Sequence, residues 1–332
     1  MRRFACCFLL AGISCSTQAC CGVSPDGAGF EFAGQRNVIV WDPVTKTEHF
    51  IRIANFISDD ENLGFIAPTP GVPELSEVNA EVFDLATEAI FRYEKAIYDA
   101  DLRPRIGCAA EPESVAAGAA AEDAVEILSQ EDVGGYRATT LRARDAVGFR
   151  KWLAQNKFKT EKSIEEWIQF YMKKDWVFTA FLIKSQDGAA VISPVHMSFK
   201  TDRPYAPYYV PKANFPRASA VLEVAFYAPA VYQSVGVPAD KVKTAPILDD
   251  HRQLLAQHLN LKEAPKDLAV SLSHYKTFPN PDATDDLFFH QTAKTPSWPV
   301  NLNPAKPYIL AGIVGFFVVR AARRKSRQSR MS

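Results

Sequence analysis

A short apolar segment near the C-terminus most constrains what this chain can fold into. Residues 308–319 read YILAGIVGFFVV, and six cationic side chains follow within the next eleven residues. A segment that ends in so many charges is poorly suited to a buried strand or helix, which is the competing interpretation. We therefore expect one transmembrane helix at 307–322, with Arg320 extending its reach by snorkelling. The side chains expected to anchor this helix are Tyr308, Phe316, Phe317, Arg320, Arg323 and Arg324.

The charges beside this segment set the expected orientation. Cytoplasmic segments next to a membrane helix carry an excess of Lys and Arg. The basic tail at 323–332 is therefore expected in the cytoplasm, with the body of the protein outside. The same layout is also typical of a C-terminal sorting signal that a peptidase removes after export, although no sorting motif precedes this segment.

The N-terminus has the parts of a secretory signal peptide. Two arginines follow Met1, an apolar run covers 4–13, and Thr17-Gln18-Ala19 places small residues where signal peptidase reads them. We expect residues 1–19 to be removed and the body to reside in the cell envelope. A retained N-terminal anchor and a lipid attached to Cys15 or Cys20 are the alternatives.

Three cysteines would remain after removal of the signal peptide, namely Cys20, Cys21 and Cys108. An exported protein meets an oxidising compartment, and three thiols allow at most one bridge within a chain. We expect Cys108 to pair with Cys20 or Cys21. A three-cysteine metal site is the alternative, but two adjacent cysteines plus a distant one do not have metal-site spacing.

The charge distribution argues against one class of partner. Lys and Arg number 38, as do Asp and Glu, so the formal net charge is zero. Eight of the basic residues lie at the two ends of the chain, which leaves the body acidic. An acidic body is unsuited to nucleic acid, whose phosphates require a basic surface.

Hydrophobic periodicity predicts an α+β fold with mixed or antiparallel sheets and a few amphipathic helices. A first α+β part is expected at 20–108 and a second at 123–276. Between them, the Ala-rich stretch 109–122 has little to bury and is expected to be a flexible loop or linker. Residues 277–306 are rich in Pro and Asp and are expected to form a stalk that leads to the membrane.

Within the two parts, the expected elements follow from apolar alternation and from capping residues. Asp145 and Ser163 are each expected to begin a helix, and strands at 176–183 and 191–199 are expected to pair across a turn. The other expected strands are at 38–41, 49–56, 63–67, 125–128, 136–141, 220–227 and 268–274. The other expected helices end near 101 and cover 248–259.

The sequence has no catalytic, cofactor or metal motif that can be assigned. The six histidines are scattered, and only His251 and His258 are expected to share a helix face, without a further ligand beside them. No Gly-x-Ser-x-Gly nucleophile motif occurs. We therefore expect no catalytic residue, no metal ion and no cofactor.

One aromatic stretch is the best candidate for a binding surface. Its aromatic residues alternate with prolines between 204 and 216. Rigid aromatic side chains provide contact area at low entropic cost, so one interpretation is an exposed surface that binds a peptide or glycan. The other interpretation is an irregular edge strand whose tyrosines pack on the domain. The residues of the candidate surface are Tyr205, Tyr208, Tyr209 and Phe215.

Several stretches are informative when taken together, namely the CCG after the signal peptide, LGFIAPTP at 63–70, VGGY at 133–136, and the apolar segments at 149–153 and 176–181. Together they resemble the bacterial family of unknown function DUF2330. The resemblance covers roughly residues 20–230. It implies an exported envelope protein, often with a C-terminal membrane helix, and no assigned activity. The LGFIAPTP segment contains less valine than is usual in the family.

These features favour an anchored envelope protein that binds an envelope protein, a peptide or a glycan and catalyses no reaction. The alternative is an extracytoplasmic hydrolase whose active site is assembled from Asp, Glu or His residues far apart in the sequence.

Overall fold

A computed structural model of the chain describes its folded parts. The described residues are 21–23, 31–57, 64–100, 125–156, 158, 164–183, 194–211, 220–236, 238–278 and 283–299. The predicted signal peptide, transmembrane helix and basic tail lie outside these residues, as do Cys20, Cys108 and Phe215. None of the helices in the described part combines the length and the hydrophobicity that a membrane span requires.

The chain divides into two compact units. The first comprises 1–92 and 109–296, and the second comprises 93–108 and 297–332. In the second unit, the Tyr93 hydroxyl donates a hydrogen bond to the Ser297 carbonyl at 3.3 Å. The Tyr93 ring also meets Trp298 edge-on, with ring centres 5.4 Å apart. Every described strand belongs to the first unit.

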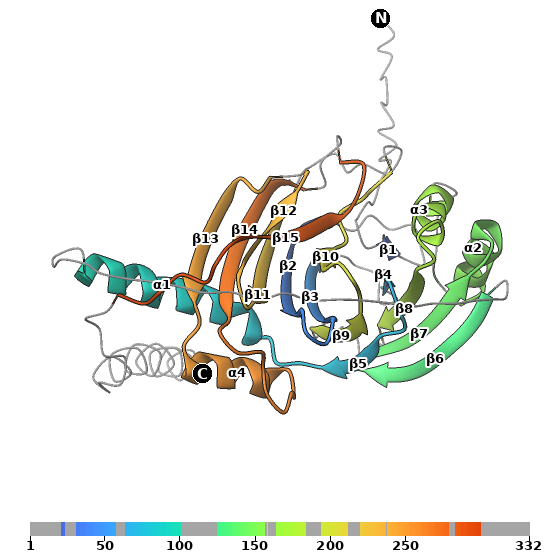
Figure 1. The fold of residues 1–332 in the computed structure, drawn as a ribbon. Coiled ribbons are helices and arrows are strands. Elements are labelled where there is room, and N and C mark those ends of the chain that lie inside the picture. The colour runs from blue at the N-terminus through green and yellow to red at the C-terminus, as the bar shows by residue number, and fades with distance from the viewer. Residues whose placement is uncertain are drawn as a thin grey trace, which may run out of the picture. The chain divides into compact units, whose positions relative to one another are not determined.

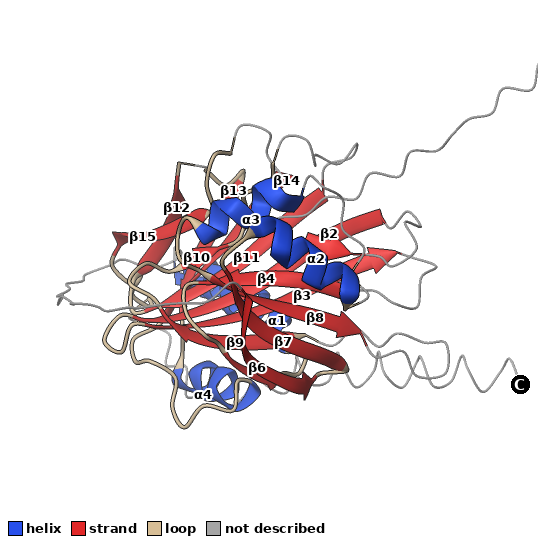
Figure 2. Ribbon diagram, turned by 90° about the vertical axis from the view of Figure 1, so that its right-hand side faces the viewer, coloured by secondary structure: helices blue, strands red, loops and turns tan. Residues whose placement is uncertain are grey.

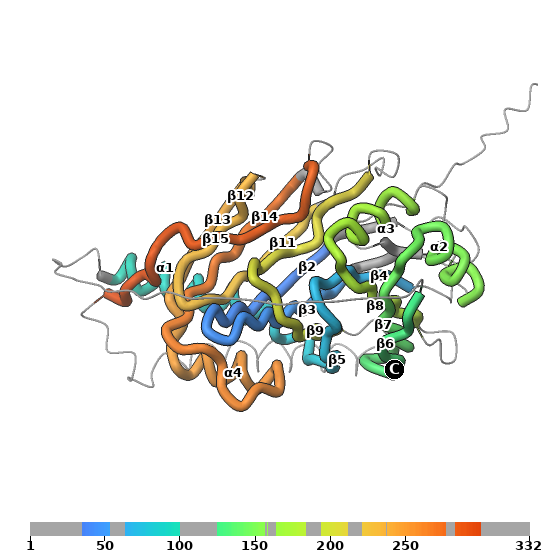
Figure 3. Tube along the Cα trace, turned by 45° about the vertical axis from the view of Figure 1, so that its right-hand side comes forward, coloured from blue at the N-terminus to red at the C-terminus, as the bar shows by residue number. Residues whose placement is uncertain are grey.

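The largest sheet has seven strands in the order β13, β14, β11, β2, β3, β9 and β5 (Figures 1 and 3). Neighbouring strands run antiparallel except β11 and β2, which are parallel. The strands are β2 (Glu31–Asp42), β3 (Thr47–Ile57), β5 (Glu74–Glu77), β9 (Val195–Lys200), β11 (Ala220–Ala228), β13 (Lys241–Pro246) and β14 (Ala269–Phe278).

The strands β2 and β3 form the hairpin that the sequence predicts. Asp42 closes its turn, because its Oδ1 accepts the amide N–H groups of Val44 at 2.9 Å and Thr45 at 3.3 Å. On β2, Ile39 and Val40 point to opposite faces of the sheet, and both are fully buried. The centre of the sheet is therefore covered on both faces.

The second sheet has five antiparallel strands in the order β1, β4, β8, β7 and β6. They are β1 (Cys21–Val23), β4 (Gly64–Thr69), β6 (Val125–Val133), β7 (Tyr136–Ala143) and β8 (Val177–Ile183). The helices α2 (Ala146–Gln155) and α3 (Ile164–Met172) lie side by side next to this sheet (Figures 1 and 2). Asp145 caps α2 as predicted, accepting the amides of Val147 and Gly148.

A third, smaller sheet joins β10 (Tyr205–Ala206), β15 (Leu287–Ala293) and β12 (Val231–Val235). One main core lies between the sheets and is rich in aromatic rings. Its members include Ile39, Phe50 and Met197 from the seven-stranded sheet, Phe65 and Phe181 from the five-stranded sheet, and Leu287 and Phe289 from β15. Aromatic rings prefer to pack in stacked or edge-on pairs. Phe65 stacks on Phe181 with ring centres 4.6 Å apart.

The helix α1 (Val82–Ala100) begins against β2. The Arg36 guanidinium of β2 donates to the Phe83 carbonyl at 2.6 Å and to Glu223 of β11 at 2.8 Å. The buried positions Val82, Ala86 and Ala89 follow the three-to-four spacing that predicts this helix. The helix α4 (Asp249–His258) is joined to α1 by an ion pair between Asp250 and Arg92 at 3.1 Å.

The α+β class with mixed sheets is confirmed, but three details of the predicted organisation are corrected. The strands β8 and β9 do not pair with each other; they belong to different sheets. The predicted parts 20–108 and 123–276 are interleaved, because each contributes strands to both large sheets. The predicted stalk contains β15, whose Leu287 and Phe289 are buried in the core. Apolar alternation predicts a strand but not its partner, which explains the first two errors.

Candidate functional site

The structure buries two of the tyrosines expected on a binding surface. Tyr205 is 0% exposed and Tyr208 is 1% exposed. The Tyr205 hydroxyl donates to the Pro68 carbonyl, and its amide donates to Glu48 at 3.0 Å. These residues therefore pack in the core, and the prediction that they form an exposed surface is wrong. The alternative interpretation, tyrosines packed on the domain, describes them.

Tyr209 remains half-buried and belongs to a cluster at the surface that alternates cations with aromatic rings. Its ring stacks on Phe170 with centres 3.8 Å apart. The Lys174 ammonium lies 4.1 Å from the centre of Phe170 and 5.2 Å from that of Phe288. The guanidinium carbon of Arg203 lies 4.0 Å from the centre of Phe288. We refer to Phe170, Lys174, Arg203, Tyr209 and Phe288 as the cation–aromatic cluster.

A buried carboxylate holds this cluster together. The Asp286 side chain is 0% exposed and forms an ion pair with Lys174 at 2.9 Å. Its Oδ1 also accepts the Tyr171 hydroxyl at 2.7 Å and the amides of Tyr208 at 2.9 Å and Tyr209 at 3.1 Å. Four donors compensate the cost of burying the charge. Asp286 thus fixes the α3 end, the segment after β10 and the start of β15 relative to one another.

Tyr209 presents a hydroxyl donor over a wide pH range. Burial, and then the nearby Glu166, raise the pKa of Tyr209 to about 12. The hydroxyl therefore stays protonated at physiological pH, and it donates to Glu166 at 3.2 Å. At the other end of the cluster, Arg203 is exposed, and none of the described residues forms an ion pair with it. Stacking on Phe288 supports one face of its guanidinium and leaves the N–H edge available.

A second constellation links a serine to two histidines on one face of the seven-stranded sheet. His196 of β9 lies across from Ser76 of β5, and the Ser76 hydroxyl is 2.9 Å from His196 Nδ1. The other ring nitrogen, His196 Nε2, is 3.0 Å from Nδ1 of His49 on β3. The sequence interpretation did not connect these two histidines; only the strand register brings them together.

The serine–histidine chain resembles a nucleophile with its base, but its proton affinity is low. Burial, and then the adjacent His49, lower the pKa of His196 to about 3. Burial is also the main cause that lowers the pKa of His49 to about 4. A general base is most effective when its pKa lies near the working pH. Both imidazoles are neutral at pH 7, yet they accept a proton from a serine poorly.

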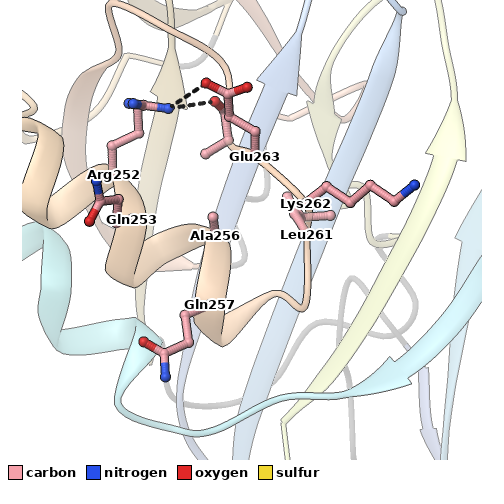
Figure 4. A pocket seen from close by; sticks show the side chains of 8 residues that line it. Arg252, Gln253, Ala256, Gln257, Leu261, Lys262 and Glu263 are labelled. Atoms are coloured by element: carbon pink, nitrogen blue, oxygen red, sulfur yellow. Dashed lines mark hydrogen bonds and ion pairs between the residues drawn. The ribbon is translucent and has the colours of Figure 1, made fainter.

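A depression lies beside α4 (Figure 4). It is lined by Arg252, Gln253, Ala256, Gln257, Leu261, Lys262, Glu263 and Ala264. Arg252 is already engaged there, with its guanidinium 3.2 Å from Glu263 and 3.1 Å from Asp249. Within the described ranges, no group of three or more His, Cys, Asp or Glu residues is arranged to hold a metal ion. Of the two cations that line the depression, Lys262 is the exposed one.

Sequence reasoning identified one member of the cation–aromatic cluster, Tyr209, and missed the other four. Phe170 and Lys174 belong to α3 and the turn after it, Arg203 precedes β10, and Phe288 lies in β15. These positions span more than a hundred residues, so no local spacing connects them. One usable signal was the apolar triplet at 287–289, which is unusual in a solvated stalk and indicates a strand.

Comparison with solved structures finds weak likeness to one viral protein. The crystal structure of baculovirus P35 aligns with a TM-score of 0.33 and 10% identity over 66% of this chain and 75% of that chain. A mutated baculovirus P35 after caspase cleavage gives a TM-score of 0.37 and 9% identity, covering 79% of this chain and 99% of that chain. The P35 of a caspase-8/P35 complex gives a TM-score of 0.34 and 6% identity, with 81% and 98% covered. These scores are too low to carry an inference about function.

Comparison with sequences gives a family. No curated protein matches the chain. A family model described as "Uncharacterized protein conserved in bacteria (DUF2330)" matches residues 15–228. This range includes the stretches that carry the resemblance in the sequence and extends through β11. Since the match spans well over half of the chain, the protein belongs to the DUF2330 family.

Proposed function

We propose that this protein is a non-enzymatic binding protein of the bacterial cell envelope that holds an acidic segment of another envelope protein at the cation–aromatic cluster. Its body would lie outside the cytoplasm, on the single C-terminal helix expected at 307–322. The signal-peptide pattern and the basic tail support this topology. The single observation that carries the binding role is the exposed Arg203 guanidinium stacked on Phe288.

The chemistry of the cluster favours an acidic partner. Arginine binds carboxylates through paired N–H groups, and an aromatic ring beneath the guanidinium restricts its motion before the partner arrives. Half-buried aromatic residues around an arginine are the residue types that dominate binding energies at protein interfaces. The ring faces of Phe170 and Phe288 are already covered by Lys174 and Arg203, which leaves little room for a sugar ring to stack.

The alternative function, a hydrolase, rests on the chain from Ser76 through His196 to His49. Two facts weigh against it. The histidines bind protons too weakly for an efficient general base at neutral pH. The depression described above also lies elsewhere, because it is lined by α4 and its following loop and not by these three residues. The binding role is therefore the better supported of the two.

A photo-cross-linking experiment in the native envelope tests the binding role. The cross-linking residue replaces His290, which is exposed and lies two residues after Phe288 on the same side of β15. We expect capture of a partner at a segment rich in Asp and Glu, and we expect Arg203→Gln to lower the yield about tenfold. Arg137→Gln, which changes an exposed arginine on β7, serves as the charge control.

A second cross-linking position provides the background against which the proposal can fail. A cross-linker at Val44, in the exposed turn between β2 and β3, reports background capture. If the His290 position captures nothing beyond that background, the cluster is not a binding site. Capture that Arg203→Gln leaves unchanged, or that maps to a glycan or to a segment without acidic residues, also contradicts the proposal.

A further inference from the structure

The two large sheets end in edge strands of opposite charge. Among the described strands, β6 is the last strand of the five-stranded sheet and β13 is the last strand at one end of the seven-stranded sheet. An edge strand presents N–H and C=O groups that no neighbouring strand uses, and such groups can pair with another chain. The charges on each edge therefore decide which strand can approach it.

The β6 edge is long, open and acidic. None of its nine residues is buried, whereas most residues of the adjacent β7 are. Its exposed charges are Glu126, Glu131 and Asp132, of which Asp132 also faces Arg137 at 3.8 Å. Ile127 is 55% exposed and offers apolar contact beside these charges. The C-terminal end of β6, drawn as an arrowhead, lies near β5 (Figure 1), so the open part is its N-terminal part.

The β13 edge is short and basic. It has six residues, begins with the exposed Lys241 and continues through the half-buried Lys243. Its inner side pairs with β14 from Lys241 opposite His274 to Pro246 opposite Ala269. Residues 241–244 are exposed or half-buried, whereas Ala245 and Pro246 are buried, so residues 241–244 form the part of this edge that a second strand can reach.

From this complementarity we infer that the acidic β6 edge of one copy of the protein takes up the basic β13 edge of a second copy. Like edges cannot pair in the same way, because two β6 strands would oppose glutamates and two β13 strands would oppose lysines. The contact is therefore heterologous, because each copy contributes its β6 edge to one contact and its β13 edge to another. Such contacts form rings or open chains and not closed two-fold dimers. Anchoring in one membrane would raise the local concentration of copies and favour this association.

Charge reversal tests the inference on the full chain in detergent micelles. One variant carries Glu126→Lys with Glu131→Lys, and a second carries Lys241→Glu; all three positions are exposed. Sedimentation should show that the wild-type protein grows in mass with concentration and that added salt weakens this growth. Each variant alone should associate at least about tenfold more weakly. An equimolar mixture should associate again, because each β6 then meets a β13 of opposite charge.

Two controls make the test decisive. Lys262→Glu changes an exposed lysine on the loop after α4 and should leave association unchanged. Circular dichroism should give the wild-type fold for every variant, since the substituted side chains are exposed. The inference fails if the wild-type protein stays monomeric at every concentration. It also fails if the folded variants associate like the wild type, or if their mixture does not regain association.

Discussion

At the scale of single residues, one buried carboxylate connects three segments of the fold. Asp286 accepts hydrogen bonds from Tyr171 and from the amides of Tyr208 and Tyr209, and it pairs with Lys174. Replacing it by Asn removes the charge and leaves the Lys174 ammonium without its buried partner. We expect Asp286→Asn to lower the free energy of unfolding by about 2–4 kcal/mol in urea titrations.

Its neighbour provides the matched control. Asp285 also pairs with Lys174, at 2.6 Å, but its side chain is 52% exposed. Exposed ion pairs contribute little, so Asp285→Asn should cost less than about 1 kcal/mol. Equal costs for the two substitutions would show that the buried hydrogen bonds of Asp286 do not hold the three segments together.

The buried histidines predict how stability changes with acid. In the folded protein the pKa of His196 is about 3, against 6.5 without burial, so the unfolded chain binds more protons below pH 6.5. The stability that the neutral His196 contributes is therefore fully present above pH 6.5 and is lost as pH falls toward the pKa of His196 in the folded protein. We expect His196→Gln to remove a pH-dependent loss on the order of 3 kcal/mol between pH 6.5 and 4, measured by denaturant unfolding at a series of pH values.

A fully buried carboxyl makes stability change with pH in the opposite direction, which provides an internal check. Burial raises the pKa of Glu48 well above its ordinary value, although the Tyr205 amide opposes this shift. Here the folded state binds more protons, so the stability from Glu48 is present below pH 4.5 and is lost as pH rises. Glu48→Gln should remove this loss of stability at rising pH and leave the loss at falling pH, which comes from His196, unchanged. A variant that altered both losses would refute the separate assignment.

At the scale of elements, one glycine sets how closely β4 can approach its surroundings. A Cβ on Gly64 would lie 2.6 Å from the Phe181 carbonyl of β8 and 2.8 Å from the Phe158 ring. The clash involves backbone and cannot be relieved by turning one side chain. We expect Gly64→Ala to lower the melting temperature and to cost about 1–3 kcal/mol. Gly71→Ala is the control, since its Cβ would come no closer than 3.7 Å to the Lys200 carbonyl; a cost as large as that of Gly64→Ala would contradict this account.

Sequence patterns predict where the strands of this protein lie better than they predict which strands pair. The β2–β3 hairpin and the Asp145 cap were predictable because a turn and a cap are local. The positions of β8 and β9 were also predictable, but alternation in each strand is satisfied by any neighbour that covers its apolar face. The eleven residues between them are enough for the chain to move to a different sheet. The serine–histidine chain was missed for the same reason, since it exists only through the β5–β9–β3 register.

At the scale of the whole molecule, the interleaving of the two predicted parts decides how the protein can be divided. The seven-stranded sheet takes β2, β3 and β5 from before residue 109 and its other strands from after residue 122. The strand β11 pairs on one side with the central strand β2, whose residues 37–41 are buried. Removing the first part would leave one edge of β11 and both edges of β9 without the strands that pair with them.

We therefore expect a fragment covering 123–299 to show no cooperative thermal transition when produced alone. A full-length protein cleaved at an engineered protease site within 109–122 should instead keep its circular dichroism spectrum and elute as one species. Strands from both fragments remain paired in that nicked protein, so it should unfold in one transition. If the 123–299 fragment alone melted as cooperatively as the intact chain, β2 and β3 would be dispensable. The two parts would then be separate domains, as the sequence first suggests.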